Sequence, residues 1–150
     1  MRAEFRAWNA RVLANAQALA RALGDQGLRL VSGGTDTDLM LVDLGPLGVT
    51  DARAAGALEA AGLACNKNVI PFDPLPAETA SGIRLSGNAG TTRGFGPAEF
   101  ERIGAMVGRI VAACRSGGPG LDAETAAVRA EVRRLCRGFP IYPGVCPGAP

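Results

Sequence analysis

The hydrophobic period changes along the chain, and this alternation constrains the fold more than any other feature of the sequence. Apolar residues recur at spacings of three and four over 5–23 and again over 100–114, which is the pattern of one helix face. Short apolar runs lie between these stretches, at 28–32, 39–44 and 83–85, and are typical of strands. The pattern predicts one small domain built as an α/β layer.

Glycine and proline mark where the elements begin and end. We expect the first helix to end at Gly24, and a turn at Gly33-Gly34 to join the next two runs as a β-hairpin. The segment 66–76 has three prolines in its last six residues, so it predicts an ordered loop rather than a regular element. Residues 143–150, rich in proline and glycine, are an expected flexible tail.

Three further helices have recognisable starts. Thr50 can cap a helix over 51–61, which Gly62 would stop, and Asp122 can cap the last helix of the chain. Pro97 suits the first turn of the long helix because that position has no use for a backbone N–H. The predicted order is helix, hairpin, helix, strand, helix, helix.

Charge and composition exclude several classes of function. The chain has 150 residues and a formal net charge of +2, without a basic stripe, and it contains five Phe, one Trp and one Tyr. Nucleic acid is therefore not an expected partner. No apolar stretch reaches the roughly 18 residues of a membrane span, and the first residues lack the apolar core of a signal peptide. We expect a cytoplasmic protein with no membrane contact.

The chain has no histidine and one lysine, Lys67, against fifteen arginines. The lack of histidine removes the usual general base, the usual partner of a nucleophilic serine or cysteine, and the commonest metal ligand. Chemistry that needs a lysine imine must use Lys67 or a lysine of another chain. The polar neighbours Asn66 and Asn68 favour an exposed lysine over a Schiff-base lysine.

The cysteines do not predict a metal site. They have no close-pair spacing, and without histidine they make a poor zinc set, so buried or incidental thiols are expected. These cysteines are Cys65, Cys114, Cys136 and Cys146.

Two other groups of residues near the hairpin favour structural roles. Asp36 and Asp38 would share one face of a strand, and Asp43 lies further along, but no ligand-rich loop surrounds them. Solvated edges or backbone caps are therefore favoured over a metal cluster. Gly33-Gly34 lacks the spacing of a dinucleotide fingerprint and the ending of a P-loop, which favours a tight turn.

Arg84 is the strongest candidate for a binding residue. It lies in the middle of the short apolar run SGIRL (81–85), which predicts a buried guanidinium, and a buried guanidinium needs an anion. Two partners remain open from the residues alone. One is the carboxylate or phosphate of a substrate, held in bidentate geometry, and the other is an aspartate of this chain in an internal ion pair.

Five motifs, in matching order and spacing, resemble the C-terminal part of serine hydroxymethyltransferase. They are LVSGGTDT (30–37), LMLVDL (39–44), NKN with PFDP (66–68 and 71–74), SGIR (81–84) and TTRGFG (91–96). The resemblance extends over the opening helix and the segment FPIY (139–142), so it covers nearly the whole chain. Five ordered motifs are specific, whereas each one alone is weak.

The resemblance implies a fold-type I enzyme that depends on pyridoxal phosphate, interconverts serine and glycine, and passes the one-carbon unit to tetrahydrofolate. The part that is similar is the small C-terminal domain, a short and mostly antiparallel sheet covered by helices. This gives a single domain with a leading helix at 1–24, the small α/β domain at 25–142 and the tail at 143–150. By the same resemblance Arg84 matches the arginine that binds the substrate α-carboxylate, Asn68 matches a residue of the folate pocket, and Thr35 with Asp36 forms the scaffold of the hairpin.

The resemblance also indicates what this sequence lacks. The family's cofactor lysine lies in the large domain, so we expect no catalytic, cofactor-binding or metal-binding residue here. The expected protein is one chain of a split transferase, or a fragment of a longer one, that acts in one-carbon and amino-acid metabolism. We expect it to be inactive alone and to need a large-domain partner that binds pyridoxal phosphate, within a homo- or hetero-oligomer.

The sequence departs from the family pattern at a few positions near the expected pocket. The family usually has histidine at Asp38, an apolar residue near Glu78, threonine at Ala80, and Gly-Thr-Pro at Ser86-Gly87-Asn88. The expected fold is unaffected by these changes, but other functions stay open. They are a related aldolase or transaldolase, an α-methylserine hydroxymethyltransferase, and a non-catalytic binding or regulatory module.

Overall fold

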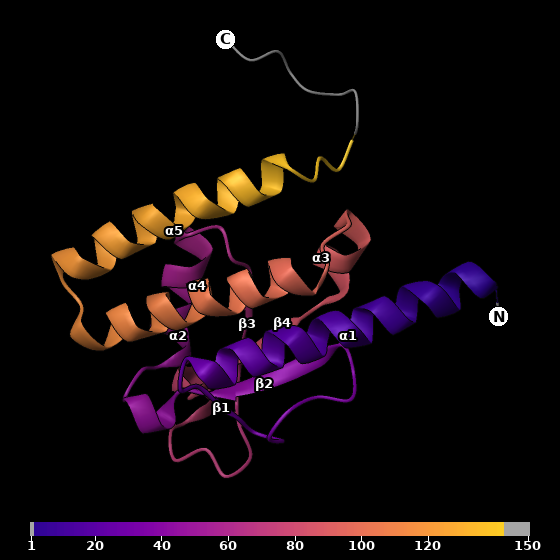
Figure 1. Cartoon of the computed structure of the whole chain (residues 1–150). Coiled ribbons are helices and arrows are strands. Elements are labelled where there is room, and N and C mark those ends of the chain that lie inside the picture. Colours follow the sequence, from indigo (N-terminus) through magenta and orange to yellow (C-terminus); the bar gives the residue numbers. More distant parts are fainter. Residues whose placement is uncertain (1, 143–150) are drawn as a thin grey trace.

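A four-stranded sheet carries helices on one of its faces in the computed structural model, which describes residues 2–142 (Figure 1). The helices are α1 (Ala3–Asp25), α2 (Asp51–Ala60), α3 (Asn88–Arg93), α4 (Pro97–Ser116) and α5 (Pro119–Arg137). The strands are β1 (Arg29–Leu30), β2 (Leu39–Asp43), β3 (Asn66–Asn68) and β4 (Gly82–Ser86). No helix within residues 2–142 is long and apolar enough to cross a membrane.

The sheet has the strand order β1-β2-β4-β3, and each neighbouring pair is antiparallel. The predicted hairpin is confirmed, because β1 pairs with β2. Arg84 lies at the centre of the sheet, opposite Leu41 of β2 on one side and Asn66 of β3 on the other. The fold class, a short antiparallel sheet covered by helices, is therefore confirmed.

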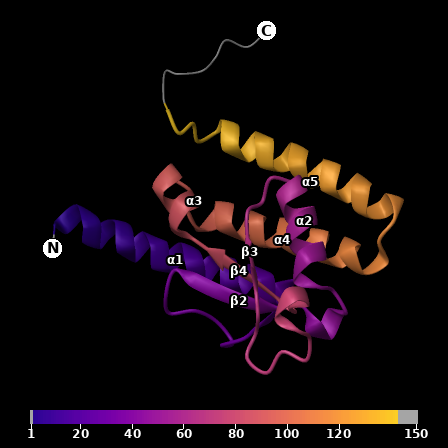
Figure 2. The same ribbon diagram turned by 180° about the vertical axis from the view of Figure 1, so that it is seen from behind.

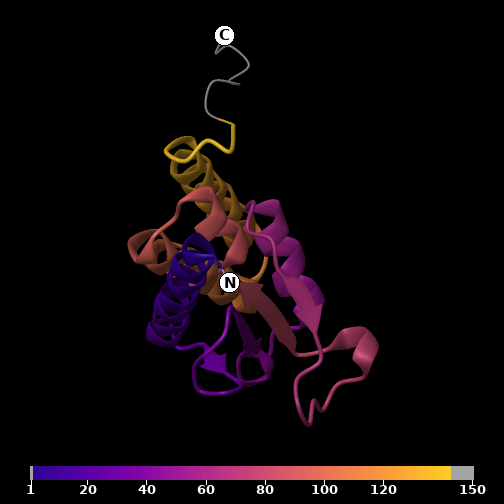
Figure 3. The same ribbon diagram turned by 90° about the vertical axis from the view of Figure 1, so that its right-hand side faces the viewer.

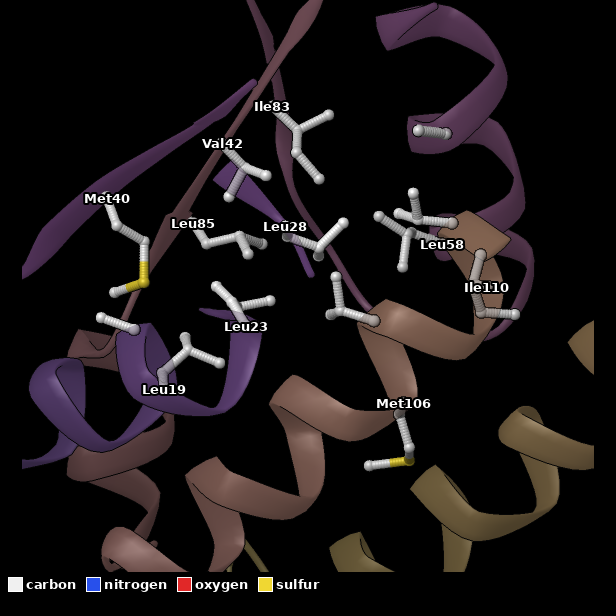
Figure 4. Close-up of a cluster of buried hydrophobic side chains, with 14 of the residues drawn as sticks. Leu19, Leu23, Leu28, Met40, Val42, Leu58, Ile83, Leu85, Met106 and Ile110 are labelled. Atoms are coloured by element: carbon white, nitrogen blue, oxygen red, sulfur yellow. The ribbon is translucent and has the colours of Figure 1, made fainter. Parts of the chain in front are cut away.

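Alternate residues of the two central strands build the core. Side chains on successive residues of a strand point to opposite faces, so β2 and β4 each present one apolar face to the helices. Figure 4 shows these side chains packed against α1 and α4. They are Met40, Val42, Ile83 and Leu85, which meet Leu19, Leu23, Leu58 and Ile110 from the helices. Each fully buried leucine or isoleucine side chain stabilises the fold by about 2 kcal/mol.

The helices form two layers over this face of the sheet. α1 packs along α4, while α5 lies on the far side of α4 and next to α2 (Figures 1 and 2). Gly104 allows the close crossing of α1 and α4, since a Cβ at this position would lie 2.5 Å from the Cβ of Ala22. Val128 and Leu135 are the buried apolar residues of α5.

Most element boundaries agree with the sequence pattern, and two caps show why. The Oγ1 atom of Thr50 accepts the N–H of Arg53 at 3.4 Å, which is the predicted cap of α2. Gly62 follows that helix with φ +85°, a conformation that favours glycine. Cβ-bearing residues would be strained there, so the predicted stop of α2 is confirmed.

Three predictions about elements were wrong. Residues 66–68 form the strand β3 rather than the start of a loop, because their backbone pairs with the edge of β4. The short helix α3 was not predicted. The last helix begins at Pro119, in the N-terminal position that suits proline, so Asp122 lies inside its first turn and does not cap it.

Candidate functional site

The sheet face opposite the helices holds the sequence-predicted binding residues. Residues directly across from one another share a face, as do residues two apart on one strand. By this register Arg84, Asn66, Asn68 and Leu41 all point away from the core that Ile83 and its neighbours fill. We call these four residues and Asp43 the open sheet face.

Arg84 is exposed, which corrects the expectation of a buried guanidinium. The ion pairs within residues 2–142 join Arg29 to Asp43 and Arg109 to two glutamates, so none of them holds Arg84. The internal ion pair is therefore not formed in the described part of the chain. Arg84 instead presents a free guanidinium on the open sheet face.

Asp43 explains why Arg84 has no partner in this face. It is 4% exposed, and its Oδ2 atom accepts from Nε of Arg29 at 2.7 Å while its Oδ1 atom accepts from the backbone N–H of Gly45 at 2.8 Å. Asp43 lies opposite Gly82, two residues from Arg84 along β4, but both of its carboxylate oxygens are thus already engaged. An exogenous carboxylate can meet Arg84 without competition from this aspartate.

Asn68 lies on the same face as Arg84 and opposite Gly82, two residues away along β4. Its side chain is half-buried, and its Nδ2 atom donates to the carbonyl oxygen of Val69 at 3.2 Å. A Cβ at Gly82 would lie 2.6 Å from the backbone oxygen of Asn68, so a residue without a side chain is required for β3 to approach β4 here. The structure thus brings Asn68 and Arg84 to one surface.

Asp73 holds the loop between these two residues in shape. Its carboxylate accepts from the backbone N–H groups of Ser81 at 2.8 Å, Leu75 at 3.1 Å and Ile70 at 3.4 Å, and from the hydroxyl of Ser81 at 2.8 Å. Desolvation acts to raise the pKa of Asp73, but these hydrogen bonds, led by that of the Ser81 N–H, outweigh it and lower the pKa. No role was predicted for Asp73 from the sequence, although an aspartate before a proline is a turn signal that could have indicated one.

The loop held by Asp73 projects from the body of the molecule (Figure 3). It also exposes apolar side chains. Phe72 is fully exposed and has φ +59°, a backbone conformation that non-glycine residues rarely adopt. Val69 is 46% exposed and Leu75 40% exposed on either side of it. The loop that follows Asn68 of the open sheet face is therefore apolar on its surface and lacks a cover from residues 2–142.

The hairpin loop is held by threonine hydroxyls. Oγ1 of Thr35 donates to the carbonyl oxygen of Leu39 at 2.6 Å, and Oγ1 of Thr37 accepts the N–H of Leu39 at 3.2 Å. The tight turn comes slightly earlier than expected: the N–H of Gly33 donates to the carbonyl oxygen of Leu30 at 3.0 Å, so Gly33 closes the turn and Gly34 lies in the bend after it. Asp36 is exposed and makes no side-chain hydrogen bond with the described residues.

The aspartates around the hairpin do not form a metal cluster. Asp36 and Asp38 lie in the loop before β2, not on a strand, so the predicted shared face is wrong. Oδ2 of Asp38 accepts from Nδ2 of Asn88 at 2.6 Å, which means that two positions at which the sequence departs from the family pattern are in contact. Within residues 2–142 no three carboxylate or thiol groups come together as metal ligands.

The remaining candidate nucleophiles lie away from the open sheet face. Lys67 is exposed and pairs with Ile83, so its side chain leaves the sheet on the side opposite Arg84. Cys65, Cys114 and Cys136 are free thiols, and burial is the main cause that raises the pKa of Cys114 and of Cys65. Cys146 lies outside the described residues.

A model of the family described as serine hydroxymethyltransferase matches residues 1–107. The chain belongs to the serine hydroxymethyltransferase family. It is 53% identical over 145 residues to serine hydroxymethyltransferase of Sphingopyxis alaskensis and 53% identical over 144 residues to that of Rhizorhabdus wittichii. It is also 50% identical over 139 residues to serine hydroxymethyltransferase 2 of Burkholderia pseudomallei.

These alignments cover 93–96% of the chain but 33% of each relative. The chain thus spans about a third of the length of the serine hydroxymethyltransferases that it matches. Its residues do not fit a pyridoxal phosphate site, because the single lysine leaves the sheet on the side away from Arg84 and no histidine is present to stack on a pyridine ring.

Proposed function

We propose that this chain supplies the substrate-carboxylate clamp and part of the folate pocket of a serine hydroxymethyltransferase. In this role Arg84 binds the α-carboxylate of the amino acid and Asn68 contacts tetrahydrofolate. The cofactor pyridoxal phosphate would be held by a large-domain partner and would supply the electron sink of the reaction. The complete protein would be a cytoplasmic oligomer.

The exposed, unpaired guanidinium of Arg84 carries this proposal. A planar guanidinium can donate two parallel N–H bonds to a carboxylate, and such a bidentate pair fixes the orientation of the substrate as well as its position. Arg84 sits on β4, one of the two central strands of the sheet, where neighbouring strands on both sides hold its backbone. The clamp is therefore preorganised by the sheet rather than by a loop.

Two features of the open sheet face support a partner that covers it. The face bears polar and charged groups around Arg84, and its rim at the 69–76 loop exposes Val69, Phe72 and Leu75. Exposed apolar side chains that gather at one edge are typical of a surface that meets another protein segment. The missing two thirds of the matched relatives provide a segment of the required kind.

The test reconstitutes the enzyme from two pieces. This chain is mixed with the N-terminal two thirds of the Sphingopyxis alaskensis relative, and serine cleavage with tetrahydrofolate is measured for each piece and for the mixture. We expect turnover from the mixture and none from this chain alone. Turnover from this chain alone would contradict the proposal, and so would an inactive mixture whose pieces bind each other.

Arg84→Ala in the reconstituted enzyme separates a clamp from a structural role. Loss of a charged hydrogen-bonded pair is worth about 1.5–3 kcal/mol, so we expect serine affinity to fall about 10–100-fold. The serine affinity of Arg84→Lys should lie between those of Arg84→Ala and the unsubstituted enzyme, because lysine keeps the charge but lacks the planar guanidinium that donates two parallel hydrogen bonds. The free energy of unfolding of the chain should change by less than about 1 kcal/mol, since Arg84 is exposed.

The matched control is Arg21→Ala, which removes an exposed arginine from α1 and should leave serine affinity unchanged. An equal loss of stability and affinity in Arg84→Ala would assign the arginine to folding. Serine or folate binding by the isolated chain without any turnover on mixing would favour a non-catalytic binding module instead.

A further inference from the structure

A groove along α5, to which α2 contributes only Ala60 among the described residues, is lined by charged residues that have no role in the proposed function. It has a volume of about 520 Å³ and lies beyond the helix layer, where α5 runs next to α2 (Figure 2). Its charged lining residues are Arg129, Arg133, Arg134, Arg137 and Asp122. Four guanidinium groups against one carboxylate make this the basic groove of the molecule.

The guanidinium groups of the basic groove lack internal partners. The other two acidic residues of α5, Glu124 and Glu131, are both bound by Arg109 of α4, at 2.6 Å and 2.7 Å. They are therefore turned toward α4 and do not neutralise the groove. All four arginines are exposed, and none of their side chains forms an ion pair or hydrogen bond with residues 2–142.

Three of these arginines form one row, which corrects the expectation from the sequence that the chain has no basic stripe. Arg129, Arg133 and Arg137 are four residues apart, so they lie above one another on the helix over about 12 Å. Like charges at this spacing destabilise a helix by about 0.2–0.5 kcal/mol per pair. The C-terminal helix dipole compensates only near Arg134 and Arg137, in the last turn. An external anion that bridges the row would relieve the repulsion along its whole length.

The rest of the lining is polar at one end and apolar along its floor. Asp122 and Thr125 lie toward the N-terminal end of α5, and the floor is made of alanines, two of which alternate with the arginines of α5 while the third comes from α2. These are Ala60, Ala126 and Ala130. Helix backbone groups are bonded within each helix, so the floor offers no edge to which an extended peptide could pair.

We propose that the basic groove binds a linear oligophosphate, the group shared by nucleoside triphosphates and inorganic tripolyphosphate. The closely spaced phosphates would lie on the row of arginines, whose forked donors match phosphate oxygens. In a nucleotide, the alanine floor would accept the flat base, and Asp122 with Thr125 would accept or donate hydrogen bonds to hydroxyl groups. This site does not depend on the role of Arg84.

The test titrates the full 150-residue chain with ATP and, separately, with tripolyphosphate by calorimetry in about 50 mM salt. We expect binding that weakens as salt rises, because exposed charges are screened at higher ionic strength. The double variant Arg133→Ser/Arg137→Ser should lose at least about tenfold in affinity. Tighter binding of ATP than of tripolyphosphate would identify a nucleotide site, and equal binding an inorganic oligophosphate site.

The matched control is Arg11→Ser/Arg21→Ser, which removes the same charge from the exposed side of α1 and should keep the affinity. Helical circular dichroism checks that both double variants are folded, and Arg133→Lys/Arg137→Lys tests the forked geometry at constant charge. The proposal is overturned if neither probe binds, or if the two serine variants lose affinity equally. Tighter binding of a single-stranded oligonucleotide or of hexaglutamate than of both probes would also overturn it.

Discussion

Asp73 shows at the scale of one residue how a loop without regular structure is held rigid. One carboxylate accepts four hydrogen bonds from the segment 70–81, and so fixes the connection between Asn68 and Arg84. Prolines fix φ at three positions of the same loop, but they cannot bring its two ends together. The hydrogen bonds to Ser81 do this, since they join the loop to the residue that precedes β4.

The lowered pKa of Asp73 predicts a loss of stability in acid. The folded state favours the ionised carboxylate, so the stability that Asp73 contributes is fully present above the unfolded value of about 3.9. It is lost as the pH falls through the lower folded pKa, because the unfolded chain binds the proton first. We expect the urea concentration at the unfolding midpoint to decrease once the pH is lowered past about 4. The Asp73→Asn variant should be less stable at pH 7, and its midpoint should depend less on pH in the acid range.

Urea unfolding between pH 7 and pH 2.5 measures this difference. Asp25→Asn is the matched control, because Asp25 is exposed and makes no side-chain hydrogen bond with the described residues. That variant should follow the profile of the unsubstituted chain. An acid profile unchanged by Asp73→Asn would assign the loss to other carboxyl groups.

Arg84 could be predicted from the sequence as a candidate binding residue, whereas the exposure of its side chain could not. Its neighbours Ile83 and Leu85 are apolar, and a continuous apolar run indicates burial on both faces of a strand. In this one-sided sheet the two neighbours face the core and Arg84 faces outward. Whether Arg84 is buried or exposed depends on which face of the sheet the helices cover, and a pattern of five residues does not contain that information.

Elements differ in how strongly their own residues specify them. The long helices α1 and α4 were predicted because their apolar stripes span many turns and because glycine or proline marks their ends. β3 was missed because Asn-Lys-Asn has low strand propensity, and its strand conformation comes from backbone pairing with β4. α3 has six residues, too few for a helical period to be visible.

Two glycine-to-alanine substitutions should have opposite effects on stability, because one glycine lies at the crossing of α1 and α4 and the other lies on an open helix surface. Gly104→Ala would place a methyl group against Ala22, and such overpacking costs about 1–3 kcal/mol, more than the helix propensity of alanine returns. We expect a net loss of about 1–2 kcal/mol. Gly56→Ala in α2 meets no atom within 4 Å and should instead stabilise the chain by about 0.5–1 kcal/mol.

Thermal or urea unfolding of the two variants, each compared with the unsubstituted chain, measures these shifts. The pair is matched because both positions are helical and receive the same methyl group. Equal stabilisation by the two substitutions would mean that α1 and α4 do not cross closely at Gly104.

At the scale of the whole molecule, α1 is part of the core rather than a separate arm. It contributes Leu19 and Leu23, which are at most 2% exposed, to the cluster that also holds side chains of the sheet. Buried Asn15 donates from Nδ2 to Oγ1 of Thr91 at 2.9 Å and to the carbonyl oxygen of Phe95 at 3.0 Å. We therefore propose that the leading helix at 1–24 and the segment 25–142 fold as one unit.

The single tryptophan makes this proposal measurable. Trp8 lies on α1 and donates from Nε1 to Oγ1 of Thr92 in α3 at 3.3 Å, so its fluorescence reports the docking of the first helix. Far-ultraviolet circular dichroism reports all the helices together. If α1 and the remainder unfold cooperatively, the two signals give the same urea midpoint and slope. An independent helix would instead lose its tryptophan signal at a lower urea concentration than the circular dichroism signal.

A chain without residues 1–25 gives a second test. We expect it to show no cooperative transition, because the sheet would lose its cover. A cooperative transition that persists in the shortened chain would contradict the proposal.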